Sequence, residues 1–124
     1  MPTVEIPKKE WKSFLDSFSQ MHENWLVGIE VEGTGIDDDR QVLLDAGTFH
    51  GVSMSEDSDE DLVIVGAGSL PQKHVIHSVD GTERIVVERD ERGADMALRI
   101  EASDGTNTIV SFERSVPPEM LNGV

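Results

Sequence analysis

The sequence predicts an α+β fold that is mainly β: an N-terminal amphipathic helix followed by an antiparallel meander of about eight strands, forming a small barrel or sandwich. Three observations support this prediction: one helical stripe of apolar residues, several later runs with alternating apolar residues, and turn-forming residues between those runs. No second helix of useful length separates the runs, which disfavours a parallel sheet. At 124 residues, the chain fits a single domain, 1–124, with one core.

The helix is predicted over about 8–22. Its apolar residues recur at i, i+3, i+4, i+7 and i+10: Trp11, Phe14, Leu15, Phe18 and Met21. His22 comes at the end of this segment, where the helix dipole favours a basic side chain, and Trp25 is placed to stack on it.

After Asn24 the apolar period changes to two, which indicates strands. Asp80-Gly81 and Asp104-Gly105 each stand between extended runs and predict hairpins with type I′ turns. The tail, 115–124, cannot continue a ladder through its two prolines. The predicted strands lie at about 25–32, 40–46, 49–55, 62–66, 73–79, 83–89, 96–103 and 106–113.

The charge of the chain excludes several partners. With 25 acidic and 10 basic residues, the formal charge is −15. Such a surface repels phosphate backbones and anionic lipids, so neither nucleic acid nor membrane is an expected partner. Residues 1–62 hold 15 of the acids and 4 of the bases. Solubility, or an ion-rich cytoplasm, is the simpler explanation of this surface, and a basic protein partner is the alternative.

Cysteine is absent, so no disulfide framework, thiolate zinc site or cysteine nucleophile is available. No apolar run reaches the roughly 20 residues of a membrane span. The first residues lack the apolar region of a signal peptide. We therefore expect a cytoplasmic protein.

An acidic stretch between 55 and 62 is the most distinctive motif. Asp57, Asp59 and Asp61 match the start of an EF-hand loop, but Leu62 replaces its glycine and Gly68 its final glutamate, which excludes that motif. The stretch is interpreted as a solvated hairpin tip, and a looser calcium site at the three aspartates is an alternative. Its acidic residues are the protein-binding candidates: Glu56, Asp57, Asp59, Glu60 and Asp61.

Two glycine motifs are set aside. The segment from Val63 to Pro71 resembles a dinucleotide-binding start, but Pro71 replaces the third small residue and an extended run follows, so Gly66 and Gly68 are interpreted as turn residues. Gly51-Val-Ser53-Met-Ser55 lacks the last glycine of a nucleophile elbow.

The histidines suggest one further alternative. His74 and His77 are three apart and point to opposite faces of a strand, so they cannot chelate one metal together. His50 can join either of them across strands, with Asp45 or Glu56 nearby in sequence. No catalytic residue, cofactor site or cofactor is predicted, because no two of the many carboxylates stand out as an acid–base pair.

The N-terminal residues carry a recognisable pattern, E-I-P-x-x-E-W-x-x-F…F-S…H-x-x-W. It resembles a family of short acidic bacterial proteins known only as a domain of unknown function. The resemblance implies a bacterial, cytoplasmic, stand-alone protein and supplies no activity, cofactor or catalytic residue. The residues that carry it are Glu5, Ile6, Pro7, Glu10, Trp11, Phe14, Phe18, Ser19, His22 and Trp25.

Three functions stay open. The sequence favours a non-enzymatic acidic module that binds or regulates a basic protein. The second is a barrel that holds a small apolar ligand. The third is a metal-assisted enzyme with dispersed carboxylate and histidine groups. The walls of the apolar-ligand site would be Trp25, Val27, Ile29, Phe49 and Ile64.

Overall fold

The computed structural model describes residues 3–33, 41–55, 62–70 and 73–116. One helix and an antiparallel sheet make up this part of the chain, which confirms the mainly β α+β fold. The elements are β1 (Thr3–Glu5), the 3₁₀ turn η1 (Lys8–Glu10), α1 (Trp11–His22), β2 (Leu26–Glu32), β3 (Gln41–Met54), β4 (Val63–Leu70), β5 (Lys73–Val79), β6 (Thr82–Arg89), β7 (Asp95–Ala102) and β8 (Asn107–Val116).

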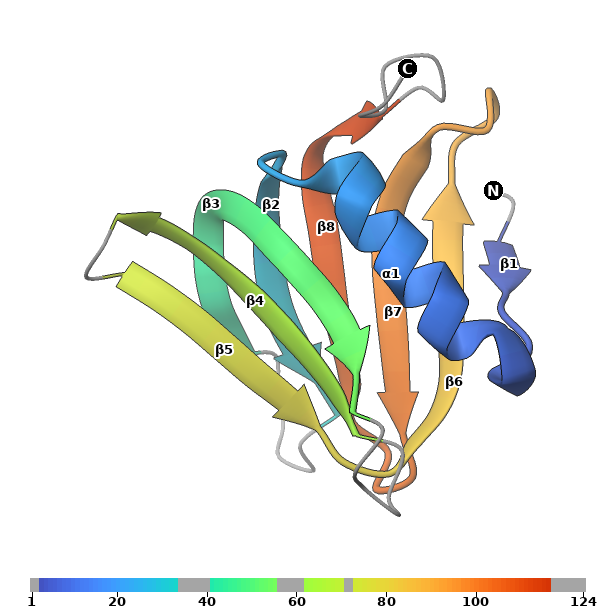
Figure 1. The fold of residues 1–124 in the computed structure, drawn as a ribbon. Helices are drawn as coiled ribbons and strands as arrows, with labels where there is room; N and C mark the ends of the chain where they lie inside the picture. Colours follow the sequence, from blue (N-terminus) through green and yellow to red (C-terminus); the bar gives the residue numbers. More distant parts are fainter. Residues whose placement is uncertain (1–2, 34–40, 56–61, 71–72, 117–124) are drawn as a thin grey trace.

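The eight strands form one sheet in the order β1-β6-β7-β8-β2-β3-β4-β5. Two meanders, β2 to β5 and β6 to β8, are joined where β2 pairs with β8. β3 is strongly curved, so that β4 and β5 lie in front of the strands at the back of the sheet in Figure 1. The sheet does not close into the predicted barrel, because its two outer strands, β1 and β5, do not pair within the described chain.

Several strand boundaries differ from those predicted. The runs 40–46 and 49–55 are one continuous strand, β3, and β4 continues through the glycines expected in a turn. Gly66 pairs with Gly51 on one side and with Ile76 on the other, so hydrogen bonding to two neighbours outweighs the low strand propensity of glycine. The sequence does not predict β1, since three residues are too few to show a period, and β8 extends past 113 to Val116.

The two Asp-Gly turns have different roles. Asp104-Gly105 joins the paired strands β7 and β8, as predicted. Within this turn only Gly105 has a positive φ (93°), and its N–H donates to the Ala102 carbonyl. The turn is therefore type I followed by a left-handed glycine, and not the predicted type I′. The hairpin predicted at Asp80-Gly81 is wrong: that turn links β5 to β6, which are not neighbours in the sheet.

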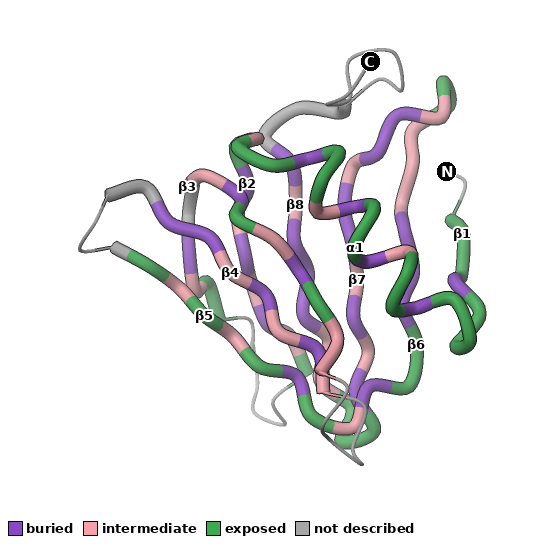
Figure 2. Tube along the Cα trace, viewed as in Figure 1, coloured by how far each residue is buried: buried purple, intermediate pink, exposed green. Residues whose placement is uncertain are grey.

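The core lies between α1 and the concave face of the sheet (Figure 2). The buried side chains of α1 are Trp11, Leu15, Phe18 and His22, spaced at i, i+4, i+7 and i+11. Met21, predicted on this stripe, is 40% exposed, and His22 takes the next buried place. The sheet contributes alternate residues of its strands, among them Val27, Ile29, Phe49, Val63, Val65, Ile85, Val87, Leu98, Ile100 and Val110.

The helix also covers a strand edge. β2 pairs with β3 only as far as Thr48, so the rest of that β3 edge needs other partners. The Asn24 N–H donates to the Phe49 carbonyl at 2.9 Å, and the Phe49 N–H donates to the Trp25 carbonyl at 2.8 Å. Further along, the Val52 N–H donates to the Ser19 hydroxyl at 2.8 Å, and this hydroxyl lies 2.7 Å from the Val52 carbonyl oxygen.

Ser19→Ala should therefore destabilise the protein by about 1–3 kcal/mol, because the N–H of the buried Val52 loses its acceptor and the hydroxyl can no longer donate to the Val52 or Leu15 carbonyl. Chemical denaturation measures this change. Ser13→Ala is the matched control, since the Ser13 hydroxyl is exposed and donates only to the Glu10 carbonyl of its own turn. Equal midpoints for the two variants would show that Ser19 does not anchor the helix.

Candidate functional site

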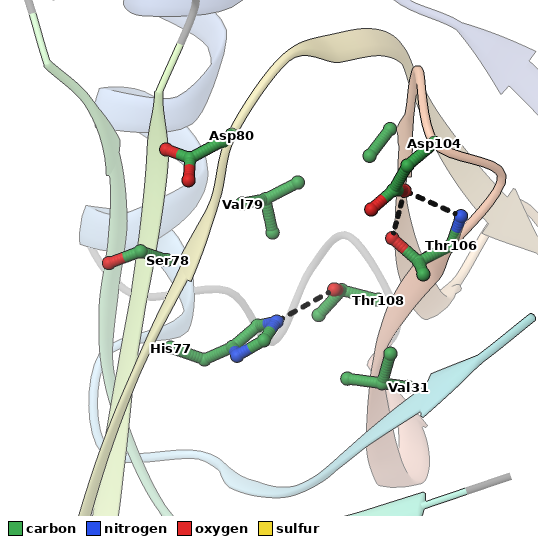
Figure 3. Close-up of a pocket in the computed structure, with 9 residues that line it drawn as sticks. Val31, His77, Ser78, Val79, Asp80, Asp104, Thr106 and Thr108 are labelled. Atoms are coloured by element: carbon green, nitrogen blue, oxygen red, sulfur yellow. Dashed lines mark hydrogen bonds between the residues drawn. The ribbon is translucent and has the colours of Figure 1, made fainter. Parts of the chain in front are cut away.

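A cavity of about 220 Å³ opens at the end of the sheet where β5 and β7 finish and β8 begins (Figure 3). Its lining comes from β5 and the turn after it, from the end of β7 and the β7–β8 turn, and from single residues of β2 and β8. The lining residues are Val31, His77, Ser78, Val79, Asp80, Ala102, Asp104, Thr106 and Thr108.

Two turns tied together form one side of this cavity. The Ser103 N–H donates to the Gly81 carbonyl at 2.8 Å. Gly81 has φ of 65°, and a Cβ there would lie 2.7 Å from the Ser103 hydroxyl, so a residue with a side chain would strain this contact. The turns that carry Asp80 and Asp104 are therefore held in a fixed relation.

Asp104 is held in its charged form. Its Oδ1 accepts hydrogen bonds from the Thr106 N–H at 2.9 Å and from the Thr106 hydroxyl at 2.7 Å (Figure 3). The backbone hydrogen bond, followed by the side-chain one, lowers the pKa of Asp104 below its ordinary value. The carboxylate is thus ionised at neutral pH, and its geometry is fixed by its own turn.

His77 and Thr108 lie deeper in the cavity. His77 Nε2 is 3.1 Å from the Thr108 hydroxyl (Figure 3), and burial lowers the pKa of His77. At neutral pH, the imidazole is therefore uncharged, and both groups can donate or accept a hydrogen bond. Apolar atoms of Val31, Val79 and Ala102 complete the walls. The cavity suits a group with an aliphatic stem and a cationic or hydrogen-bonding end.

The acidic residues predicted to bind a partner lie outside the described residues: Glu56, Asp57, Asp59, Glu60 and Asp61, which include the calcium candidates. The structure does place the two ends of that connection. The Ser55 N–H donates to the Leu62 carbonyl at 2.8 Å, next to the Met54–Val63 pair of β3 and β4.

These ends lie at the same end of the sheet as the end of β5 (Figure 1), whose last residues line the cavity. Val63 pairs with both Met54 and Val79, which brings the ends of connection 56–61 beside the end of β5. The end of β2 and the start of β3, which flank residues 34–40 in the sequence, also lie at this end. The two connections contain eight carboxylates in their sequence, and the cavity adds Asp80 and Asp104. We call this region the acidic end.

The four histidines are separated into distinct settings. His50 of β3 and His74 of β5 lie together, with ring centroids 5.4 Å apart, while His77 lies in the cavity on the other face of β5. This confirms that His74 and His77 point apart. Neither carboxylate suggested for the metal site can be placed, because the Asp45 side chain and Glu56 lie outside what the structure describes. Within the described chain, no three His, Asp or Glu side chains gather closely enough to hold a metal.

His22 is the last residue of α1, at the helix end where the sequence predicts it. It is fully buried and stacks on Phe112 at 4.8 Å, rather than on Trp25. Its Nδ1 lies 2.8 Å from the Phe18 carbonyl, and its Nε2 lies 3.0 Å from Asp95 Oδ2, although off the line of a straight hydrogen bond. Asp95 Oδ1 accepts from Arg89 Nε at 3.0 Å. This cluster joins the helix to β7.

Three of the five residues predicted to line an apolar-ligand site are instead part of the packed core, and Trp25 is partly buried against it. Val27, Ile29 and Phe49 are buried in the cluster that also contains the apolar side chains of α1. Ile64 alternates with the buried Val63 and Val65, so it faces away from this core. The helix fills the space that the ligand hypothesis required.

The sequence does not reveal the cavity. In the sequence, Asp80 and Asp104 are recognisable only as turn residues, and nothing shows that their two turns are in contact. The available signal is the repeated V/S-D-G-T pattern, since two similar turns can meet at one end of a sheet. His77 and Thr108 are 31 residues apart, and only the topology brings them together.

Comparison with known proteins gives a family and no activity. The profile of DUF5335, a family of unknown function, matches residues 2–120. No curated protein matches the chain significantly. No solved structure does so either. Among the residues that the structure describes, no helix is long and apolar enough to cross a bilayer.

Proposed function

The chain belongs to DUF5335, a family of unknown function, and from this premise we propose that it is a non-enzymatic binding module whose acidic end receives a basic segment of another protein. One observation supports the proposal: the described strand ends that flank the acidic segments 34–40 and 56–61 lie at the same end of the sheet as the residues that line the cavity. Charge of one sign gathered in one place raises the rate and specificity of association with a partner of opposite sign.

The cavity supplies the specific part of this recognition. Asp80 and Asp104 stand beside an opening with apolar walls and an uncharged imidazole (Figure 3). A lysine or arginine side chain combines a methylene stem with a cationic end, which complements both kinds of lining. Because the Asp104 carboxylate is held by Thr106 and the backbones of the two turns are tied together, Asp104 needs little ordering on binding.

The test is titration of the protein with a lysine-rich peptide and an uncharged peptide of equal length, at about 50 and about 200 mM salt, a range over which screening changes markedly. The double variant Asp80→Asn/Asp104→Asn should bind the cationic peptide about 2- to 30-fold more weakly, because each exposed charge pair contributes about 0.2–1 kcal/mol. The Asp104→Asn substitution leaves a side-chain oxygen that can accept from Thr106, so the turn is preserved. The affinity of the wild type and of the variants for the cationic peptide should fall at the higher salt concentration.

The matched control is Glu10→Gln/Glu91→Gln, which removes the same charge from two exposed residues that do not line the cavity. This control should bind like the wild type. If both double variants lose affinity equally, attraction depends on net charge alone and the cavity has no role. If the cationic peptide binds no better than the uncharged one, the proposal is wrong.

A further inference from the structure

We propose that His50 and His74 form a two-histidine site for a borderline divalent cation, Zn²⁺, Ni²⁺ or Cu²⁺, on the outer face of the sheet. The two rings come from β3 and β5, which are separated by β4. The site is distinct from the acidic end and does not depend on the function proposed for it.

A β-bulge and a glycine pair bring the rings together. The pairing of β3 with β4 shifts register between Phe49 and Gly51, so His50 lies at an irregularity of the kind that redirects a side chain. Phe49 is buried and His50 is exposed, which places His50 on the outer face.

His74 reaches the same face from the other side of β4. It pairs with Gly68, and it is exposed while its neighbour Val75 is partly buried against the core. The outward positions of β4 between the two histidines are glycines, Gly66 and Gly68, because the alternate residues Val65 and Ala67 are buried. A Cβ at Gly66 would lie 4.0 Å from the Cβ of His50. The glycines thus leave the space above β4 to the imidazoles.

The separation of the rings suits shared coordination. A tetrahedral cation binds imidazole nitrogen at about 2.0–2.1 Å, which places the centres of two bound rings roughly 5 Å apart. The observed centroid separation is 5.4 Å, with the ring planes at 45°. The two rings therefore lie at the separation that a shared cation requires.

The ligands select the class of cation. Imidazole prefers Zn²⁺, Ni²⁺ and Cu²⁺, whereas Mg²⁺ and Ca²⁺ prefer oxygen ligands. Two protein ligands leave the remaining coordination positions for water or for a side chain of a binding partner. The formal charge of −15 raises the concentration of cations near the surface.

The test is calorimetric titration of the untagged protein with Zn²⁺ and Ni²⁺ at neutral pH, with Mg²⁺ as the hard-cation comparison. We expect one ion per chain. His50→Gln and His74→Gln should each weaken binding about 100-fold or more, because the second of two linked ligands acts at high effective concentration. Both substitutions are at exposed positions, so the fold should be retained, which the thermal midpoint without metal verifies.

His77→Gln is the matched control, since it removes a histidine of the same strand that faces the cavity. It should retain wild-type affinity for Zn²⁺, and so should Asp80→Asn/Asp104→Asn, which separates this site from the acidic end. Proton NMR of the histidine rings should show the His50 and His74 signals shifting together. Unchanged affinity in either the His50 or the His74 variant, or Mg²⁺ bound as tightly as Zn²⁺, would overturn the proposal.

Discussion

Asp95→Ala is expected to lower the free energy of unfolding by about 3 kcal/mol, because it removes one partner from a largely buried charge cluster. Asp95 Oδ1 accepts from Arg89 Nε at 3.0 Å, and Oδ2 lies 3.0 Å from His22 Nε2. The side chain of His22 is 1% exposed, so water cannot replace the lost carboxylate. The Arg89 side chain is 36% exposed and can rehydrate, which limits the loss. Urea denaturation at neutral pH measures the change.

The pH dependence of this loss follows from the charge of Asp95. Burial alone would raise the pKa of Asp95, but the close His22 imidazole and the hydrogen bond and positive charge of Arg89 outweigh it and lower the pKa below its ordinary value. The carboxylate therefore stabilises the fold above the unfolded-state pKa of about 3.9, and this contribution is lost as the pH falls through the lower folded-state pKa. The stability gap between wild type and Asp95→Asn should narrow below about pH 4. A gap that widens in acid would contradict this assignment.

Trp11→Ala should cost about 3–5 kcal/mol, which is the usual loss when a large aromatic side chain is removed from a core. Trp11 is 2% exposed and is the first buried residue of α1. Its indole N–H also donates to the Ile6 carbonyl at 2.9 Å, which ties the chain before η1 to the helix. Equilibrium denaturation monitored by circular dichroism avoids dependence on the fluorescence of the deleted residue.

Two further variants separate the contributions at Trp11. Trp11→Phe keeps most of the apolar volume but leaves the Ile6 carbonyl without its donor, for an expected cost of about 1–3 kcal/mol. Met21→Ala, on the exposed side of the same helix, should change stability by no more than about 0.5 kcal/mol. A loss at Met21 as large as that at Trp11 would mean that the helix packs through a different face.

The helix and most strands were predictable because each is a local signal. The stripe from Trp11 to Phe18 fixed the helical period, and alternation fixed the face of β2. The error at Met21 and His22 has a clear cause: hydrophobicity alone favours methionine in a core, while His22 is buried because Asp95 and the Phe18 carbonyl face its ring nitrogens. These partners come from other parts of the fold, so the sequence does not reveal them.

Strand order and the candidate site depend on contacts between distant residues. Asp80-Gly81 has the local signature of a hairpin, yet β6 pairs with β1 and β7, because burial of β5 against β4 and of β6 against β7 outweighs the turn preference. The cavity follows from that topology, since it requires the turn after β5 to meet the turn after β7. The pairing of His50 with His74 is among the combinations that the sequence allows, and the bulge in β3 selects it.

The way α1 meets β3 has a consequence for association between molecules. The Ser19 hydroxyl, the Asn24 N–H and the Trp25 carbonyl bind backbone groups on the edge of β3. An adjoining strand would otherwise occupy these hydrogen-bonding positions. A molecule whose N-terminal segment through Trp25 comes loose therefore uncovers ladder positions and the apolar interior in a single step. Such an opened form would present a further strand edge for pairing with the N-terminal segment of a neighbour, in addition to the outer edges of β1 and β5.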